Sequence, residues 1–566
     1  MNRNNERHFN QIPKMGASRT RFNRDQTILT TFDSGKLIPF YVDEVLPGDT
    51  FSVDTTAIIR MTTPKYPVFD DAFIDFYYFY TPNRILWDNF KRFMGEVEST
   101  PWMPEKKYSV PIIGVNTDAS APTKTQPDEN SILDYMGVPT KVAGGFKINA
   151  LPVRAYVMIW NEFFRDENVD NAAVFKTDDN GVKYKYSKGA EDTMENALKN
   201  AITGGNLLPV NKFHDYFTSC LPYPQRGPDV TLPMTGNAPV RIGGTKGEYE
   251  DFTGSVEMTV GTTIASNKPG TLRYTNATGA PGEKKAMIFS GVETSSGESG
   301  TGGWMYADLA SVTAATINDL RKAVAVQQYY EALARGGSRY REQVQALWDV
   351  TISDKTVQVP EYLGGGRYHI NINQIVQTSG QQGNNDTPIG ETGAMSVTPI
   401  NESSFTKSFE EHGFIIGVCC VRHNHSYQQG LERFWSRSDR LDYYVPQFAN
   451  LGEQPVKKKE IYLNGLSSKD EETFGYQEAW ADYRMKPNRV SGRMRSNATG
   501  TLDFWHYGDN YSKEPTLSQS WMAEGKEEIA RTLIVQDEPQ FFGAIRVANK
   551  TTRRMPLYSV PGLYKL

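Results

Sequence analysis

The sequence predicts a mainly β protein, an antiparallel sandwich or jelly roll with helices inserted in the connections between strands. Strand-like patterns lie toward both ends of the chain, and helical patterns lie between them. These segments do not alternate with the regular spacing of βαβ units, which argues against a doubly wound parallel sheet. Hydrophobic residues make up 38% and aromatic residues 12% of the 566 residues, enough to fill a large core.

The first strands follow from the alternation of side chains. Residues 50–61 alternate between apolar and mostly polar side chains, as in a half-buried strand. The apolar positions are Phe51, Val53, Ala57, Ile59 and Met61. Residues 72–80 are aromatic at both odd and even positions, which predicts an inner strand that is covered on both faces.

Two helices are expected after these strands. Pro82 favours a first helical turn, and the stripe that follows predicts one helix ending at Gly95. This stripe is Ile85, Leu86, Phe90, Phe93 and Met94. A clearer helix follows Pro152, with Arg154, Asn161 and Glu162 on the face opposite its apolar stripe. That stripe is Val153, Tyr156, Val157, Trp160, Phe163 and Phe164.

A third helix and two further strands complete the pattern. Residues 318–335 predict a helix that stops at Gly336, with Leu320, Val324 and Leu333 facing inward. Residues 413–421 form an uninterrupted apolar run, typical of a buried strand. Residues 541–547 alternate again, and their apolar face holds Phe541, Ile545 and Val547.

Composition limits the classes of function. The net charge of -5 provides no overall attraction to nucleic acid or to an anionic membrane, so any contact with nucleic acid must be local. No run of about 20 apolar residues predicts a membrane span, and the polar start of the chain is unlike a secretory signal. Three cysteines, Cys220, Cys419 and Cys420, cannot form a disulfide framework. We interpret them as buried thiols, which indicates synthesis in a reducing cytoplasm.

Residues 229–303 differ in composition from their surroundings. The stretch is rich in Gly and Thr, and its aromatic residues are limited to Tyr249, Phe252, Tyr274 and Phe289. Loops longer than about 15 residues are uncommon inside a compact domain and are often functional. We interpret the stretch as a surface insertion that projects from a rigid scaffold and carries recognition.

The two ends of the chain are basic. Positive charge at the N-terminal end comes from Arg3, Arg7, Lys14, Arg19, Arg21 and Arg24, in a context that predicts a loosely ordered arm. Near the C-terminus, positive charge comes from Arg546, Lys550, Arg553, Arg554 and Lys565, and no acidic residue follows Pro539. Basic ends on an acidic protein suit sequence-independent binding of a phosphate backbone, although solvated tails are an equal alternative for either end alone.

One short segment could hold a metal ion. Alternate positions of a strand place Cys419, His423 and His425 on one face, a set of residues that zinc accepts. The segment shows no fourth ligand, and the histidines are more simply explained as hydrogen-bonding groups at a strand end. The sequence contains no phosphate-binding or nucleophile motif, and neighbouring carboxylates such as Asp70 and Asp71 arise easily by chance. We expect no catalytic site and no cofactor.

Several long blocks resemble the major capsid proteins of the Microviridae, the small single-stranded DNA phages, in the gokushovirus branch. They are Phe69–Gly95, Leu320–Tyr340, Pro360–Gly366 (PEYLGGG), Val421–Val456 (with RHNHSYQQG and DYYVPQFANLGEQPV) and Phe474–Arg495. The resemblance covers nearly the whole chain except residues 229–303. The alternative from composition alone is a secreted-type carbohydrate-binding or glycoside-hydrolase β protein, because exposed aromatic residues stack on sugars.

The resemblance implies an eight-stranded antiparallel jelly roll of the viral capsid type, with long loop insertions that contain several helices. It implies 60 copies in a T=1 icosahedral shell around circular single-stranded DNA, made in the host bacterial cytoplasm and found in the virion. Residues 1–40 would form the basic arm, 41–228 and 304–566 the two parts of the jelly roll, and 229–303 a protrusion at the three-fold axis. The family carries no catalytic motif that could be transferred to this chain.

The resemblance also implies partners. These are a small basic DNA-binding protein, an internal scaffolding protein, a DNA pilot protein and a host surface receptor, a glycan among the candidates. No membrane insertion is expected, whereas a divalent cation between subunits is compatible with such a shell. For the insertion the expected role is host attachment, and the segment Phe434–Tyr444 is a candidate contact between copies because Tyr, Trp and Arg dominate interfaces.

Overall fold

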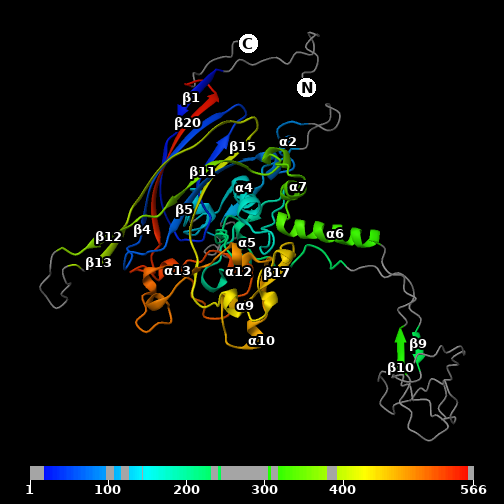
Figure 1. Ribbon diagram of the computed structural model, residues 1–566. Helices are drawn as coiled ribbons and strands as arrows, with labels where there is room; N and C mark the ends of the chain where they lie inside the picture. The colour runs from blue at the N-terminus through cyan, green and yellow to red at the C-terminus, as the bar shows by residue number, and fades with distance from the viewer. Residues whose placement is uncertain are drawn as a thin grey trace, which may run out of the picture. The chain divides into compact units, whose positions relative to one another are not determined.

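A pair of antiparallel sheets forms the centre of the larger unit of the chain (Figure 1). The computed structural model describes residues 18–96, 107–115, 126–142, 144–230, 240–243, 304–307, 317–378, 390 and 392–558. The larger unit combines Met1–Arg226 with Glu331–Leu566, and the smaller unit is Gly227–Tyr330. The prediction of a mainly antiparallel β protein with several helices is confirmed.

The first sheet joins strands from the two ends of the chain. Strands β1 (Arg19–Asn23) and β2 (Gln26–Phe32) both pair with β20 (Phe541–Arg554). Strand β20 pairs with β4 (Thr50–Met61), and β4 pairs with β14 (Thr398–Ser408). All these pairs are antiparallel. The sheet therefore brings the N-terminal and C-terminal strands side by side (Figure 1).

The second sheet has the order β11-β5-β15-β3. Its strands are β3 (Ile38–Val45), β5 (Ala72–Pro82), β11 (Glu361–His369) and β15 (Gly413–His423). Strand β5 lies inside this sheet and is flanked by β11 and β15. The prediction that this aromatic strand is an inner strand is confirmed.

The inner faces of the two sheets pack against each other to form the main core. The Tyr78 hydroxyl of β5 lies 2.7 Å from Thr55 Oγ1 of β4, so the sheets share a buried hydrogen bond. Phe409, which follows β14, contacts the rings of both Phe51 on β4 and Tyr80 on β5. Because large aromatic rings fill the space between the sheets, burial of apolar area is the main force that holds them together.

The alternating strands behave as their patterns predict. In β4 the side chains Phe51, Val53, Ala57, Ile59 and Met61 are all buried. In β20 the residues Phe541, Ile545 and Val547 are buried while Phe542 is exposed. Strand β15 is buried at almost every position, as its apolar run predicts.

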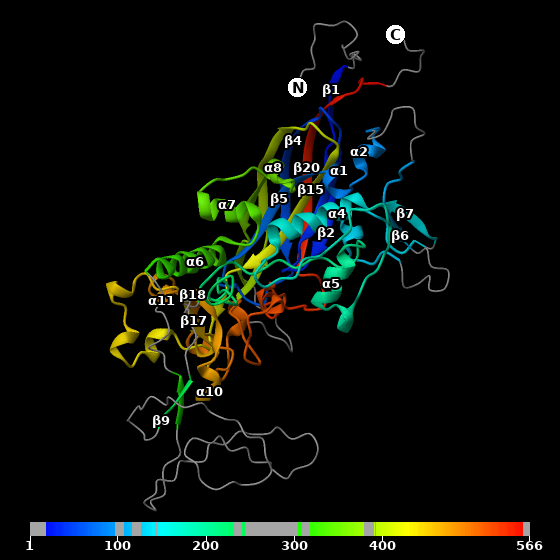
Figure 2. The same ribbon diagram turned by 90° about the vertical axis from the view of Figure 1, so that its right-hand side faces the viewer.

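Helix α4 (Leu151–Ile159) covers the outer face of the second sheet and continues into a π-helical turn at Trp160–Phe164 (Figure 2). Phe163 and Phe164 of this turn contact Phe79 and Tyr77 on β5. The predicted apolar stripe is therefore confirmed. The assignment of Arg154 to an opposite, polar face is wrong, because its guanidinium is buried and donates to the backbone oxygens of Leu86, Asp178 and Asn180.

The single helix predicted after Pro82 is broken into two short helices, α1 (Asn83–Leu86) and α2 (Phe90–Phe93). Trp87 between them has an extended backbone and is fully buried, and its indole nitrogen donates to Asp179 Oδ1 at 2.6 Å. The Asp88 N–H donates to the Thr177 oxygen. Contacts with a distant loop therefore replace the hydrogen bonds that a continuous helix would make.

The connections of the larger unit contain short elements. The strands among them are β6 (Ile112–Val115), β7 (Phe146–Asn149), β8 (Val182–Lys183), β12 (Ile372–Val376), β13 (Thr392–Ser396), β16 (Ser426–Tyr427), β17 (Glu453–Lys457), β18 (Thr473–Glu478) and β19 (Asn488–Arg489). The helices are α3 (Ile132–Tyr135), α5 (Met194–Ala201), α7 (Tyr340–Trp348), α8 (Asp354–Val357), α9 (Lys458–Ile461), α10 (Ser467–Asp470), α11 (Ala481–Arg484), α12 (Gln519–Met522) and α13 (Glu527–Ala530). None of the helices in the described residues is both long and apolar enough to cross a membrane.

The smaller unit contains a two-stranded antiparallel ribbon of β9 (Val240–Gly243) and β10 (Trp304–Ala307). Most of the predicted insertion between these strands lies outside the described residues. Helix α6 (Ile317–Gly336) belongs to the smaller unit up to Tyr330. The helix is confirmed, but Leu320 and Val324 are exposed rather than inward, and only Leu333 of the predicted stripe is buried.

The chain near residue 20 is a strand rather than a loosely ordered arm. Arg19 and Arg21 lie on β1, and Arg24 lies in the turn before β2. Backbone pairing with β20 explains the difference, because local composition does not show a partner strand more than 500 residues away in the sequence.

Candidate functional site

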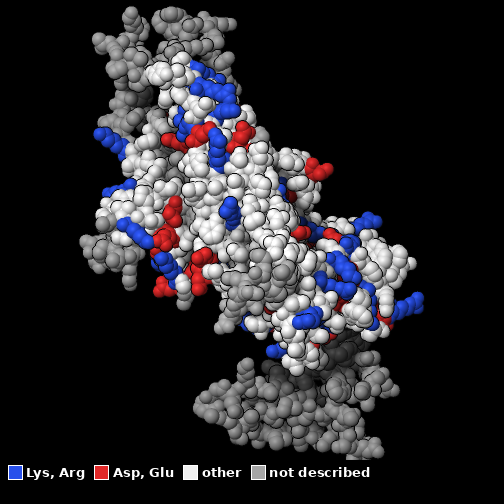
Figure 3. Space-filling view, turned by 90° about the vertical axis from the view of Figure 1, so that its left-hand side faces the viewer, with Lys and Arg blue, Asp and Glu red and all other residues white. Residues whose placement is uncertain are grey.

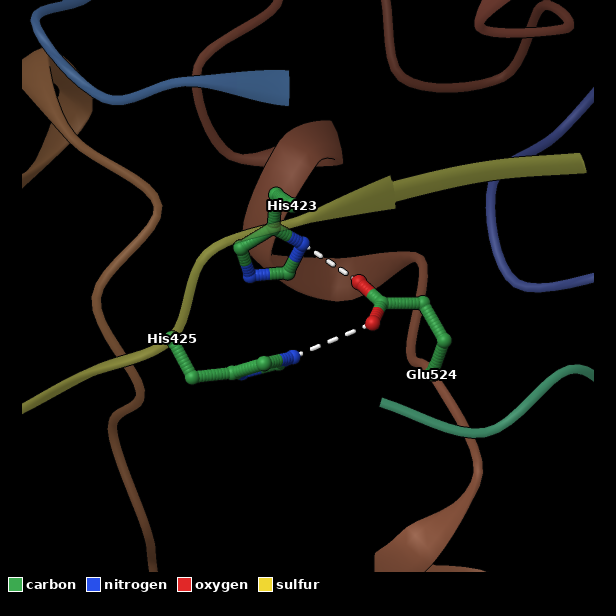
Figure 4. A group of neighbouring side chains, drawn as sticks. All are labelled: His423, His425 and Glu524. Carbon is green, nitrogen blue, oxygen red and sulfur yellow. Dashed lines mark hydrogen bonds and ion pairs between the residues drawn. The ribbon is translucent and has the colours of Figure 1, made fainter. Parts of the chain in front are cut away.

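Two histidines meet two carboxylates inside the larger unit, a group we call the histidine cluster: His423, His425, Asp509 and Glu524 (Figure 4 shows three of them). His423 ends β15, and His425 follows two residues later. Glu524 comes shortly after α12, and Asp509 lies in the preceding loop. The cluster therefore joins the end of a core strand to the segment that leads into β20.

The contacts within the cluster are short. His425 Nδ1 lies 2.7 Å from Asp509 Oδ1, and His425 Nε2 lies 3.0 Å from Glu524 Oε2. His423 Nδ1 contacts Glu524 Oε1. Asp509 Oδ2 also accepts from Tyr511 at 2.6 Å. All four side chains of the cluster are essentially inaccessible to solvent.

The carboxylates set the electrostatics of the cluster. Burial disfavours a charge on His425, but the carboxylates of Asp509 and Glu524 outweigh this effect and raise the pKa of His425 to about 10. Burial likewise opposes a charge on each carboxylate. Contacts with the histidines, and with Lys212 in the case of Asp509, nevertheless hold the pKa of both carboxyl groups well below the ordinary range.

The structure brings together two of the three residues that the sequence suggests as metal ligands. His423 and His425 come together, and Glu524 completes a group whose ligand atoms lie within 4.8 Å of one another. Cys419 is not part of that group and is buried within β15, beside Cys420. Sequence reasoning missed Glu524 and Asp509 because they lie 99 and 84 residues from His425, with no local spacing to mark them.

The cysteines are buried and free, as expected. Burial raises the pKa of Cys420 to about 12, with smaller opposing effects from charged neighbours. The thiol, rather than the nucleophilic thiolate, is therefore the form present at neutral pH.

Four of the predicted DNA-binding residues gather at one end of the first sheet. Arg19 lies directly opposite Arg554, and both side chains are exposed. Arg21 and Lys550 also point outward from the same sheet. We call these four residues the basic sheet end. Figure 3 shows Lys and Arg side chains gathered toward the upper end of the face in view.

Other predicted DNA-binding residues are engaged within the protein. Arg24 forms a two-pronged ion pair with Asp43, each bond 2.7 Å long. Arg553 pairs with the buried Asp49 at 2.8 Å, whereas Arg546 pairs with the partly exposed Asp25 at 3.0 Å. The pair of Arg24 connects the turn between β1 and β2 to β3, and the pair of Arg553 connects β20 to the turn before β4, which gives these two arginines a structural role.

Some predicted site residues lie outside the described part of the chain. They are Arg3, Arg7 and Lys14 of the basic arm and the four aromatic residues of the insertion, Tyr249, Phe252, Tyr274 and Phe289.

The candidate interface segment Phe434–Tyr444 presents apolar side chains to solvent. Trp435 is 67% exposed and Leu441 is 64% exposed. Arg437 in the middle of the segment points inward, pairs with Asp482 and lies 4.4 Å from the centre of the Tyr483 ring. The segment is thus held in place while its apolar side chains project outward, an arrangement typical of a protein interface.

A cavity of about 620 Å³ lies beside the second sheet. Its lining includes Arg339, Arg367 and Arg422. Arg339 pairs with Glu167 at 2.6 Å, and the other two arginines pair with Asp75. These charges hold the walls of the cavity together, so we assign the arginines a structural role.

Known proteins identify the family. Residues 10–563 match the family model described as "Capsid protein (F protein)". The chain is 38% identical to the capsid protein VP1 of Chlamydia phage 1, with 99% of this chain and 98% of that protein covered. It is 36% identical to capsid protein VP1 of Bdellovibrio phage phiMH2K (99% and 98% covered) and 35% identical to that of Spiroplasma virus 4 (98% and 96% covered).

These findings confirm the resemblance to the Microviridae capsid proteins and favour it over the carbohydrate-binding or hydrolase alternative. They support a structural role in the phage virion, where a capsid contains many copies of its subunit. The chain belongs to the F-protein family of phage capsid proteins.

Proposed function

We propose that this capsid protein is a jelly-roll subunit of a T=1 icosahedral shell that encloses circular single-stranded DNA. The strand orders support the jelly roll. If β1 and β2 count as one strand, the eight main strands in chain order form sheets 1-8-3-6 and 2-7-4-5. This interleaving is the one that two Greek keys produce in viral capsid domains.

The basic sheet end is the observation that supports the DNA contact. Pairing of β1 with β20 combines positive charge from both ends of the chain into one exposed patch of Arg19, Arg21, Lys550 and Arg554. Each side chain can bind a phosphate without reading the base sequence. This combination favours DNA binding over the alternative of two separate solvated tails.

We expect that the triple variant R21A/K550A/R554A packages less DNA and releases it at lower salt than the wild type. Each lost phosphate contact reduces the slope of log affinity against log salt by about 0.7 for a single strand, so three lost contacts reduce it by about 2. The measurement is the DNA content of purified particles and its release in a salt titration.

The matched control is K141A/K188A/K199A, which removes the same charge from exposed lysines with acidic partners elsewhere. The control should package DNA as the wild type does. Unchanged packaging and salt release in the triple variant would rule out the basic sheet end as the DNA contact.

We further propose that the insertion forms the surface protrusion at the three-fold axis and attaches the phage to a host receptor. The remaining partners, a small basic DNA-binding protein, a scaffolding protein and a pilot protein, follow from the family resemblance. The paired strands β9 and β10 support a projecting insertion, because they bring its two ends together. Deleting residues between these two strands therefore need not disturb the two main sheets.

Deletion of residues 248–298 is expected to leave particles that form normally but adsorb poorly to host cells. The deleted residues lie between β9 and β10, and the pairing of these two strands is left in place to hold the flanking segments together. Electron microscopy checks assembly, and counting of cell-bound particles checks attachment. Loss of assembly would instead assign the insertion to contacts between copies, and normal adsorption would contradict the receptor role.

A further inference from the structure

We propose that His423, His425 and Glu524 bind one divalent transition-metal ion of the zinc class. Their ligand atoms lie within 4.8 Å of one another. Imidazole nitrogen and carboxylate oxygen are ordinary zinc ligands. The three side chains are at most 1% exposed, so the ion would sit inside the subunit (Figure 4).

One orphaned nitrogen within the cluster supports this proposal. His423 is fully buried, its Nδ1 is paired with Glu524 Oε1, and its Nε2 has no hydrogen-bond partner among the described residues. Buried polar atoms are nearly always satisfied in native proteins, and an ion is one recognised explanation when they are not.

Asp509 orients His425 as a carboxylate usually orients a metal ligand. It accepts from Nδ1 of His425, which leaves Nε2 directed at Glu524. A histidine that binds a metal typically donates its other ring N–H to such a carboxylate. Asp509 is itself fixed, because its backbone N–H donates to the Ser426 oxygen at 2.8 Å and its side chain accepts from Tyr511.

A proton on His425 is the alternative to a metal ion as the positive charge that balances the buried carboxylates. With that proton, His425 donates to both Asp509 and Glu524 and is satisfied. Nε2 of His423 still lacks a hydrogen-bond partner among the described residues. A metal ion bound through Nε2 of His423 would engage the nitrogen that a proton on His425 leaves without a partner, which favours the ion over the proton.

Backbone packing places Glu524 firmly beside the histidines. Gly35 has a φ of 76°, and a Cβ at this position would lie 2.2 Å from the backbone carbonyl oxygen of Glu524. Only glycine therefore permits this approach. The Glu524 N–H donates to the Val210 oxygen. An ion at this point would cross-link the end of β15 to the segment before β20, and three protein ligands would leave one tetrahedral position for water.

The test is the zinc content of untagged wild-type protein, measured by elemental mass spectrometry after purification with added zinc and dialysis. We expect about one zinc ion per chain, as for a single site of this type. H423Q should lose the zinc, while the matched control H214Q, at an exposed histidine, should keep it. A zinc chelator should lower the thermal midpoint of the wild type but leave that of H423Q unchanged.

X-ray absorption at the zinc edge of the wild type provides a second measurement that does not depend on the folding of any variant. The expected spectrum shows nitrogen and oxygen ligands without sulfur. Zinc far below one ion per chain, zinc retained by folded H423Q, or sulfur in the coordination shell would each overturn the proposal. In the first case the cluster would be a hydrogen-bonded network in which a proton on His425 balances the charge of the carboxylates.

Discussion

Replacing Asp75 by Ala is expected to lower the free energy of unfolding of the subunit by about 3–5 kcal/mol, the usual effect of breaking a buried ion pair. Asp75 lies on the inner strand β5 and is 1% exposed. Its carboxylate joins Arg367 on β11 to Arg422 on β15, so one side chain connects three adjacent strands. The variant leaves Arg422, whose side chain is 14% exposed, as a buried charge without its carboxylate.

Most of this loss of unfolding free energy should come from the buried charge of Arg422, which is left without Asp75. The side chain of Arg367 is 50% exposed, so water can replace much of its interaction with Asp75. Chemical denaturation of unassembled subunits provides the measurement. Adding R422M to D75A should recover part of the stability, because an apolar side chain carries no buried charge.

Asp71, the residue directly before β5, is the matched control for Asp75. It pairs with His369 at 2.8 Å, but its side chain is 56% exposed. D71A should therefore cost less than about 1 kcal/mol. If D75A also cost less than about 1 kcal/mol, the proposed role of the Asp75 network in holding the second sheet together would be wrong.

Local patterns predicted the strands well because burial on one face of a sheet imposes a two-residue period. Strands β4 and β20 are covered on one side only, and their alternation is visible in the sequence. Helix α4 was equally visible, since its stripe packs on one surface. Leu320 and Val324 in α6 show the limit of the method, because a helical stripe does not reveal whether the same chain covers it.

Contacts between distant segments were not visible in the sequence. Arg154 looked polar and exposed, yet it is buried among backbone oxygens from two other segments. Spacing found His423 and His425, but the residues that face them lie in loops whose course depends on the whole fold. The basic ends were recognised by composition, whereas their convergence on one sheet depends on the pairing of β1 with β20.

Changing Trp435 and Leu441 to Ala together is expected to prevent the formation of stable particles while leaving the fold of the subunit intact. Both side chains are mostly exposed, so their removal should change the stability of the isolated subunit by less than about 0.5 kcal/mol each. In a shell, exposed aromatic and aliphatic side chains on a fixed loop are natural anchors between copies, and one such anchor contributes about 2 kcal/mol or more. A closed shell repeats the same contact many times, so this loss of binding free energy recurs at each contact and should strongly impair assembly.

Arg437 explains why this loop can act as an anchor. Its pairing with Asp482 and its position over the Tyr483 ring hold the loop before any copy binds, which reduces the entropy lost on association. Electron microscopy and light scattering measure assembly, and circular dichroism checks the fold. The matched control W435F/L441M keeps most of the apolar area and should assemble. Normal particles from the double Ala variant would show that Phe434–Tyr444 lies outside the contacts that hold the shell together.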